Sequence, residues 1–196
     1  MGQYYNVVIG SDFGYKVYDR SVNGKYTMAK LTEHSWFGNH FCDAIGELLY
    51  NNPKHVIWCG DYAEEDDLEH NTFCKKHNIS YDDIWEASSY KTVKKVNFDW
   101  VDKYIVNHTK HEYIKVNYYW NRSCVKIGEN DTWVLNPIPI LTSIGNGRGS
   151  GDYNGSNMDF TGYWAGDCIS VQDFVTSDYS ELKIYFKEKA YLDECE

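Results

Sequence analysis

The chain is 196 residues long, carries a formal net charge of −10 and has an aromatic content of 17%. This profile argues against a disordered chain and fits one folded, strand-rich domain, 1–196. The acidity argues against direct binding of nucleic acid, because contact with phosphate depends on Lys and Arg. The acidity is better explained by a need for solubility or by attraction to a basic surface of another protein.

Six cysteines are scattered without a C-x-x-C pair, which argues against a zinc ribbon or a redox motif. The first residues lack the basic and apolar regions of a signal peptide. No apolar stretch approaches the roughly 18 residues that span a membrane. We therefore expect a cytoplasmic protein with reduced thiols and no membrane association, and no spacing indicates a metal or a cofactor.

Aromatic and β-branched residues predict a first strand over 3–9 and a second over 15–18, which together form a hairpin. A short strand is expected over 26–31, after the Asn-Gly turn at residues 23 and 24. Apolar residues at helical spacing then predict a helix within 32–51. Ser35 is its candidate N-cap.

The compact apolar run 55–59 predicts a buried strand. Asp61 follows directly, at the end of the strand where ligands bind in open α/β sheets. Acidic residues first and basic residues last predict an exposed helix over 63–77. The polar segment 78–96 is a candidate surface insertion, and 97–104 a short helix.

Apolar flanks around Asn107-His108-Thr109-Lys110 predict a hairpin over 105–116. Further strands are expected over the ranges 116–125, 132–135 and 182–186. The ranges 161–164 and 167–171 are expected to form two short strands or one bent strand. The fold class that follows is α+β. It is a single domain with a mixed or mainly antiparallel sheet and one or two packed helices.

The stretch from Gly145 to Tyr153 is the most distinctive part of the sequence, with glycines at alternate positions 145, 147, 149 and 151. Glycine lets backbone N–H groups approach an anion closely and point the same way. Arg148 could add a bidentate contact to a phosphate or carboxylate. The candidate ligand-binding residues of this loop are Asn146, Gly147, Arg148, Gly149, Gly151, Asp152 and Tyr153.

The loop matches neither the Walker A sequence nor the dinucleotide-binding fingerprint. The structural alternative is a wide loop in which Arg148 is salt-bridged to Asp152. Both interpretations stay open at this point.

His34, beside Glu33 and Ser35, could act near neutral pH, although a helix-capping cluster is the commoner explanation of such residues. Asn107 and His108 could supply polar groups to the same cleft as Asp61 and the loop, or could form a polar turn. The candidate site therefore extends to Asp61, His34, Asn107 and His108.

Several sequence blocks together resemble a family of small proteins from bacteriophages and Firmicutes genomes. These blocks are Met1-Gly2-Gln3-Tyr4-Tyr5, Glu33-His34-Ser35, Gly60-Asp61-Tyr62-Ala63, Asn107-His108-Thr109-Lys110, Asn136-Pro137 with Leu141-Thr142, and Gly145 to Tyr153 with Trp164 and Asp167. Ser150 departs from the family pattern, which has glycine there. The resemblance implies a phage or prophage accessory protein, a setting in which countering host defence is a reasonable role.

Three functions follow as hypotheses. The first is binding of a small anionic, nucleotide-like ligand, with Arg148 and the loop holding phosphate and Asp61 and Asp152 fixing hydroxyls. The second is an acidic inhibitor that docks on a basic surface of a host defence protein, such as a CRISPR effector or nuclease. The third is a hydrolase or transferase that uses His34 or His108 as general base.

Overall fold

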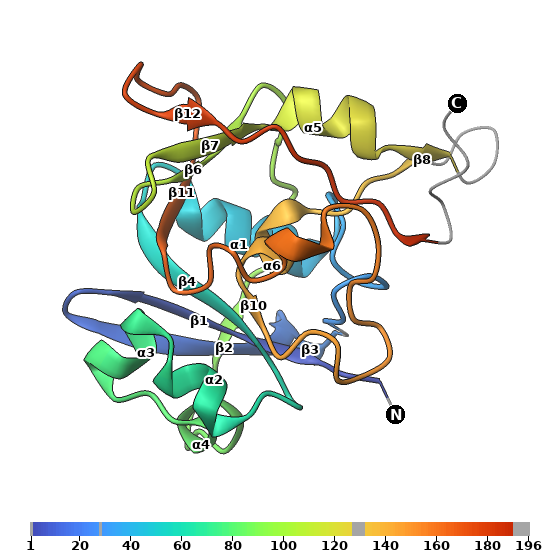
Figure 1. Ribbon diagram of the computed structural model, residues 1–196. Helices are drawn as coiled ribbons and strands as arrows, with labels where there is room; N and C mark the ends of the chain where they lie inside the picture. The colour runs from blue at the N-terminus through green and yellow to red at the C-terminus, as the bar shows by residue number, and fades with distance from the viewer. Residues whose placement is uncertain (1, 28, 127–131, 190–196) are drawn as a thin grey trace.

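The computed structural model describes residues 2–27, 29–126 and 132–189. Most of its strands form one sheet, in the order β12-β7-β6-β11-β4-β1-β2-β3, with β10 beside β4 and β5 beside β2 (Figure 1). The pairings within the sheet are antiparallel except for β10–β4, β12–β7 and β2–β5. This arrangement confirms the predicted α+β class with a mainly antiparallel sheet.

The strands of this sheet are β1 (Tyr5–Ser11), β2 (Gly14–Val22), β3 (Lys25–Tyr26), β4 (Lys54–Gly60), β5 (Lys91–Val93), β6 (Tyr104–Asn107), β7 (Glu112–Lys115), β10 (Ser143–Ile144), β11 (Cys168–Gln172) and β12 (Ser180–Glu181). A separate ribbon pairs β8 (Val125–Lys126) with β9 (Thr132–Trp133). The helices are α1 (His40–Leu49), α2 (Glu65–Glu69), α3 (Thr72–His77), α4 (Tyr81–Trp85), α5 (Val116–Ser123), α6 (Pro137–Leu141) and the 3₁₀ helix η1 (Met158–Phe160).

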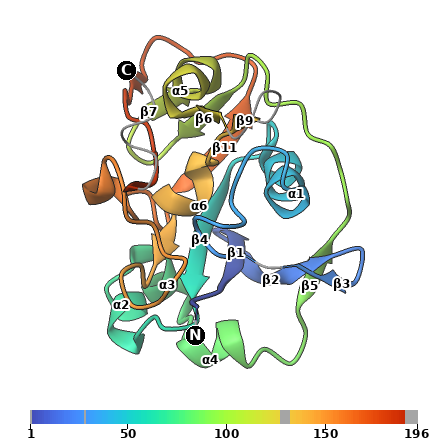
Figure 2. The same ribbon diagram turned by 90° about the vertical axis from the view of Figure 1, so that its right-hand side faces the viewer.

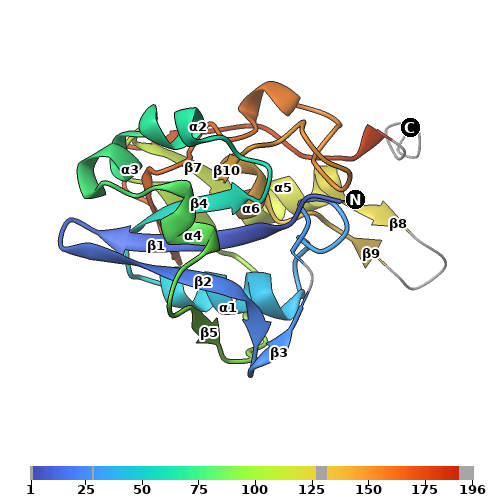
Figure 3. The same cartoon turned by 90° about the horizontal axis from the view of Figure 1, so that it is seen from below.

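Helices cover both faces of the sheet, because side chains alternate along its central strands. In β1, Val7 and Ile9 face the core beneath α1, whereas Val8 faces the side of α2, α3 and α4. Figure 3 shows α1 on one side of β1 and β2 and the three short helices on the other. The larger of the two cores lies on the α1 side.

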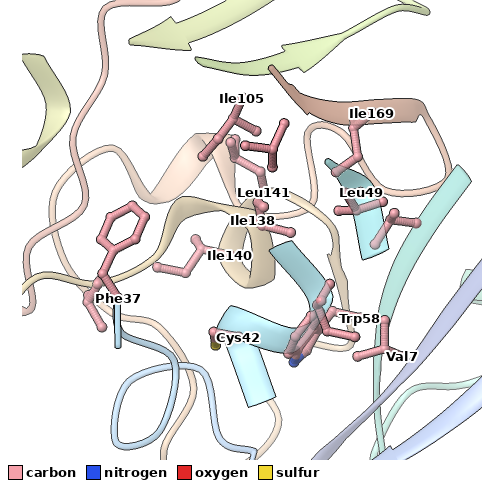
Figure 4. Packing of buried hydrophobic residues seen from close by; sticks show 14 of the residues in the cluster. Val7, Phe37, Cys42, Leu49, Trp58, Ile105, Ile138, Ile140, Leu141 and Ile169 are labelled. Carbon is pink, nitrogen blue, oxygen red and sulfur yellow. The ribbon is translucent and has the colours of Figure 1, made fainter. Parts of the chain in front are cut away.

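The larger core is closed by α6, which lies beside α1 (Figures 2 and 4). The sequence NPIPIL forms a helix because Asn136 caps it, its side chain accepting from the Ile138 N–H at 3.0 Å, and Pro137 stands at the first position. Ile138, Ile140 and Leu141 are fully or almost fully buried. Burial of each such side chain stabilises the folded state by about 1.5–3 kcal/mol relative to leaving it exposed. The glycine loop follows directly from this fixed segment.

Several predicted elements are confirmed, notably the β1–β2 hairpin, the buried strand β4 and the β6–β7 hairpin. The first helix is shorter than predicted, because Asn39 rather than Ser35 is its N-cap. The Ser35 hydroxyl instead donates to the carbonyl of Lys30 at 2.8 Å. Ser35 therefore fixes the chain before the helix and does not begin it.

The predicted helix over 63–77 is two helices, α2 and α3, because Asn71 accepts from the N–H groups of Phe73 and Cys74 and starts a new one. The segment 78–96 contains α4 and β5 and packs on the domain through the buried side chains of Ile84 and Val93. It is a covering layer of the fold.

The predicted strand over 116–125 is wrong, because residues 116–123 form helix α5. Its buried residues Val116, Tyr119 and Ser123 recur at helical spacing, so packing of one face overrides strand propensity. The range 97–104 has no helix and 161–164 is a turn. Over 182–186, Ile184 and Phe186 point inward, but no ladder forms there.

Candidate functional site

The glycine loop forms the predicted nest of backbone N–H groups, and its anion is a side chain of the same loop. The N–H groups of Gly147, Arg148 and Gly149 donate to Oδ2 of Asp152 at 2.7, 3.0 and 3.0 Å. Gly147 has φ +93°, which other residues rarely adopt. A Cβ at Gly149 would lie 2.9 Å from the backbone nitrogen of Gln3. Glycine is therefore needed at both positions to form the nest.

The second carboxylate oxygen of Asp152 faces the first strand. Oδ1 accepts from the Tyr5 hydroxyl at 2.9 Å, and that hydroxyl accepts from Nε2 of Gln3 at 2.8 Å. Nε2 of Gln3 also donates to the carbonyl of Gly145 at 2.9 Å. Burial, reinforced by Asp152, raises the pKa of Tyr5, so its hydroxyl keeps the proton it donates.

The Arg148 side chain points away from Asp152. Its Nη1 lies 2.5 Å from Oδ2 of Asp67, and its Nη2 lies 3.9 Å from Glu64. The predicted salt bridge between Arg148 and Asp152 is therefore wrong. Asp152 accepts from the backbone N–H of Arg148, whereas the guanidinium pairs with Asp67 of α2 and with Glu64, the N-cap of α2. Sequence reasoning did not identify Asp67, which lies in a run of acidic residues without a distinguishing signal.

The remaining loop residues also bond inside the fold. The Asn146 side chain accepts from the N–H of Tyr153 at 2.7 Å and donates to its carbonyl at 3.1 Å. The Tyr153 ring is buried, and its hydroxyl accepts from the N–H of Lys187 at 3.0 Å. The carbonyl of Gly151 accepts from the N–H of Thr32 at 3.2 Å. Each predicted loop residue thus has a structural partner.

A polar groove of about 410 Å³ adjoins the loop. Its described lining includes Asp67, His70, Asn71, Ser143, Asn146 and Thr161. None of the described lining residues is Lys or Arg. The carboxylate among them, that of Asp67, is paired with Arg148, so the groove offers mainly neutral hydrogen-bonding groups and no Lys or Arg to hold a phosphate.

Asp61 lies at the end of the β1–β4 strand pair, where its carboxylate and its N–H contact Tyr4. It follows β4, its Oδ1 accepts from the Tyr4 N–H at 3.0 Å, and its own N–H donates to the Tyr4 carbonyl. Nη1 of Arg148 approaches the carbonyl of the next residue, Tyr62, at 3.4 Å. Burial raises the pKa of Asp61 above its usual value. The carboxylate extends the β1–β4 ladder.

His34 lies before α1, with its ring 6.1 Å from that of Trp36. Its Nδ1 is buried and has no hydrogen-bond partner among the described residues. Burial lowers the pKa of His34, so its neutral form is favoured. No contact of His34 with the glycine loop is recorded in the described parts of the chain.

Asn107 and His108 are part of a different neighbourhood, at the end of β6. The Asn107 side chain accepts from the N–H groups of Thr109 and Lys110, which confirms the polar-turn interpretation. His108 contacts the Tyr179 hydroxyl through Nδ1 and the Ser170 hydroxyl through Nε2, each at 2.8 Å.

Burial lowers the pKa of His108. Ser170, on β11, is fully buried. The predicted histidines are therefore not gathered with the glycine loop into one cleft.

The described residues contain no group of three or more His, Cys, Asp or Glu placed to hold a metal ion. Cys42, Cys59 and Cys74 are buried, and burial raises the pKa of the Cys59 and Cys74 thiols to about 12. Such thiols are poor nucleophiles. The sixth cysteine of the sequence, Cys195, lies outside the described residues.

Among the helices that the structure describes, none has the length and apolar content to cross a membrane. Comparison of the chain with protein-family models, with curated proteins and with solved structures gave no match.

Proposed function

We propose that this chain is an acidic docking protein whose α2–α4 layer binds a basic surface of another protein. The proposal rests on the uneven distribution of acidic residues along the chain. Residues 61–86 contain nine Asp or Glu against two Lys, a net −7 of the chain's −10. The acidity is thus concentrated on one covering layer, whereas charge that serves only solubility is expected to be spread.

The acidic side chains of this layer point to solvent. Exposed carboxylates are Glu64, Glu65, Asp66, Glu69, Asp82, Asp83 and Glu86. The layer itself is firmly attached, because Leu68, Phe73 and Ile84 are buried against β1 and β4. A fixed array of like charge steers an oppositely charged partner and gives salt-dependent association.

The phage setting implied by the sequence resemblance would make the partner a host defence protein, such as a CRISPR effector or nuclease, in the host cytoplasm. Basic surfaces that hold DNA or RNA are natural targets for such a layer.

Charge reversal tests the proposal. The variant Glu65→Lys/Asp66→Lys/Glu69→Lys changes α2 without touching Glu64, whose N–H and side chain form the capping box. A matched control, Glu47→Lys/Asp99→Lys/Asp159→Lys, changes three exposed carboxylates elsewhere by the same charge.

Tagged forms are used to capture partners from a Firmicutes host lysate, and any captured protein is purified and its Kd measured at two salt concentrations. We expect the control to bind like wild type, the α2 variant to lose at least about tenfold in affinity, and binding to weaken with salt. Equal binding by both triple variants would refute the proposal.

Binding of a small anionic ligand at the glycine loop is a second proposal, favoured by the three N–H groups that converge on one carboxylate oxygen. A ligand phosphate would have to displace Asp152 from them. Native mass spectrometry before and after denaturation tests it, since a released nucleotide-sized anion would be detected directly. The anion would be absent from Gly149→Ala, because a Cβ there would crowd the Gln3 backbone and distort the nest.

The enzyme hypothesis has less support. His108 and Ser170 have the spacing of a base and a nucleophile, but the Ser170 side chain is fully buried and out of reach of a substrate.

A further inference from the structure

Arg20 is a guanidinium held among aromatic rings at the junction of β2, β3 and α4. Its Cζ lies 4.7 Å from the ring centre of Tyr4, 4.6 Å from that of Tyr26 and 5.5 Å from that of Trp85. Strand alternation from Tyr18 would place Arg20 on the α1 side. The pairing of β2 with β5 shifts register between Tyr18 and Val22, the stretch that contains Arg20.

The hydrogen-bonding capacity of this guanidinium is largely unused within the described chain. Nε and Nη1 are buried and have no hydrogen-bond partner among the described residues. The faces of the rings stabilise its charge, but they do not replace in-plane acceptors for its N–H groups. A buried donor without an acceptor is costly, and a charged one more so.

Two carboxylates of this neighbourhood, those of Asp19 and Asp61, accept hydrogen bonds from donors other than Arg20. Asp19 accepts from the backbone N–H and the hydroxyl of Ser21 at 3.2 and 3.0 Å. Asp61 accepts from the Tyr4 N–H at 3.0 Å. Within the described residues Arg20 has no ion pair of the kind found for Arg148, although its charge acts on Asp61 and partly offsets the rise that burial causes in the pKa of that carboxyl.

We propose that Arg20 is a binding site for an oxyanion, a carboxylate or phosphate group, received on the in-plane edge of the guanidinium. The planar fork of arginine matches the two oxygens of such a group. The Arg20 side chain is only partly buried, and Tyr26, at 62% exposure, forms the outer wall. The exposed Tyr26 ring also offers a flat face for an aromatic group attached to the anion.

The site borders the acidic layer, because Trp85 belongs to α4. It uses none of the glycine-loop N–H groups, and its charge is opposite to that of the acidic layer. The inference therefore stands whether or not the acidic layer binds a protein.

The test uses a property of the sequence: arginine occurs only at positions 20, 122 and 148. The Nε–Hε region of a ¹H–¹⁵N spectrum should therefore contain three signals, and Arg20→Lys identifies one of them. The full chain is titrated with inorganic phosphate and, separately, with acetate, at constant ionic strength. Arg122 is the matched control, because it is exposed and stacks on one ring, that of Tyr118, at 3.7 Å.

We expect the Arg20 signal to shift and saturate while that of Arg122 does not. Arg20→Lys keeps the charge but loses the fork, so affinity for phosphate, followed at the Trp85 indole N–H, should fall by about tenfold or more. Saturation with phosphate alone assigns the site to a phosphate-bearing ligand. Saturation with acetate as well assigns it to oxyanions that include a partner's carboxylate.

The proposal is overturned if Arg20 and Arg122 shift alike, or if neither anion saturates the Arg20 signal. Unchanged phosphate affinity in a folded Arg20→Lys variant would also overturn it. If that variant does not fold, the wild-type titration with Arg122 as internal control decides the question.

Discussion

The Tyr5 hydroxyl donates to Oδ1 of Asp152 over 2.9 Å and thereby joins the first strand of the sheet to the glycine loop. The other oxygen of the same carboxylate holds three consecutive N–H groups of that loop. One side chain thus fixes both the conformation of the loop and its place on the sheet.

Asp152→Ala should therefore lower the free energy of unfolding by about 2 kcal/mol, because charge-assisted bonds to the nest and to Tyr5 are lost together. Asp152→Asn keeps an acceptor oxygen without the charge and should lose about half as much. Denaturant unfolding measures both. Asp159→Ala, at an exposed position, is the control and should change stability by less than about 0.5 kcal/mol. A loss at Asp152 no greater than at Asp159 would contradict the structural role of this carboxylate.

The covering role of α4 gives a second prediction. Ile84 is fully buried between α4 and the sheet. Ile84→Ala should cost about 2–4 kcal/mol of unfolding free energy, because the smaller side chain leaves a cavity. Asp82→Ala, exposed on the same helix, should be nearly neutral. If the segment 78–96 were an independent insertion, both substitutions would leave global stability unchanged.

The sequence was informative where local pattern and packing agree. Residues 56–59 of the predicted run 55–59 are buried on both faces of β4, and the 105–116 hairpin is set by a polar turn between apolar flanks. The sequence pattern gave a wrong prediction where tertiary contacts determine the secondary structure, as in α5. The aromatic and β-branched residues of α5 have strand propensity, but they pack one helical face against the core. At 182–186 the predicted strand is absent: Ile184 and Phe186 are buried, but no strand pairs with them, and the apolar spacing alone could not reveal this.

For the candidate site, the glycine spacing correctly indicated backbone N–H groups arranged around an anion. It could not indicate that Asp152, five residues after Gly147 in the same loop, is that anion. The pairing of Arg148 with Asp67 joins positions 81 residues apart, and no local rule selects Asp67 from its acidic neighbours. The aromatic setting of Arg20 was missed for the same reason, since Tyr4, Tyr26 and Trp85 come from three separate segments.

The Arg148–Asp67 pair gives a third prediction. Both side chains are about one-third exposed, at 34% and 29%, so solvent and salt screen their attraction. A double-mutant cycle of Arg148→Ala and Asp67→Ala should give a coupling energy of about 0.3–1 kcal/mol that shrinks in 1 M salt. A zero coupling energy at low salt would mean that the pair does not form in solution.

Acid sensitivity gives a fourth prediction, centred on His108. Burial lowers the pKa of His108 and of His34, so both take up a proton less readily in the folded state than in the unfolded chain. As the pH falls below the ordinary histidine value of about 6.5, the unfolded state binds more protons, and stability falls with it. Above that pH the two groups contribute no slope.

His108→Gln should therefore flatten the decline in unfolding free energy between about pH 6.5 and 5, since one such histidine contributes at most about 1.4 kcal/mol per pH unit. Urea unfolding at a series of pH values measures this slope.

His70 is the opposite case, because the backbone carbonyl of Asp66, and then its carboxylate, raise the pKa of His70. Protonated His70 therefore stabilises the fold at low pH, and this stabilisation is lost as the pH rises. His70→Gln should steepen the acid decline, and a change of the same sign in both variants would contradict the assignment of burial as the cause at His108.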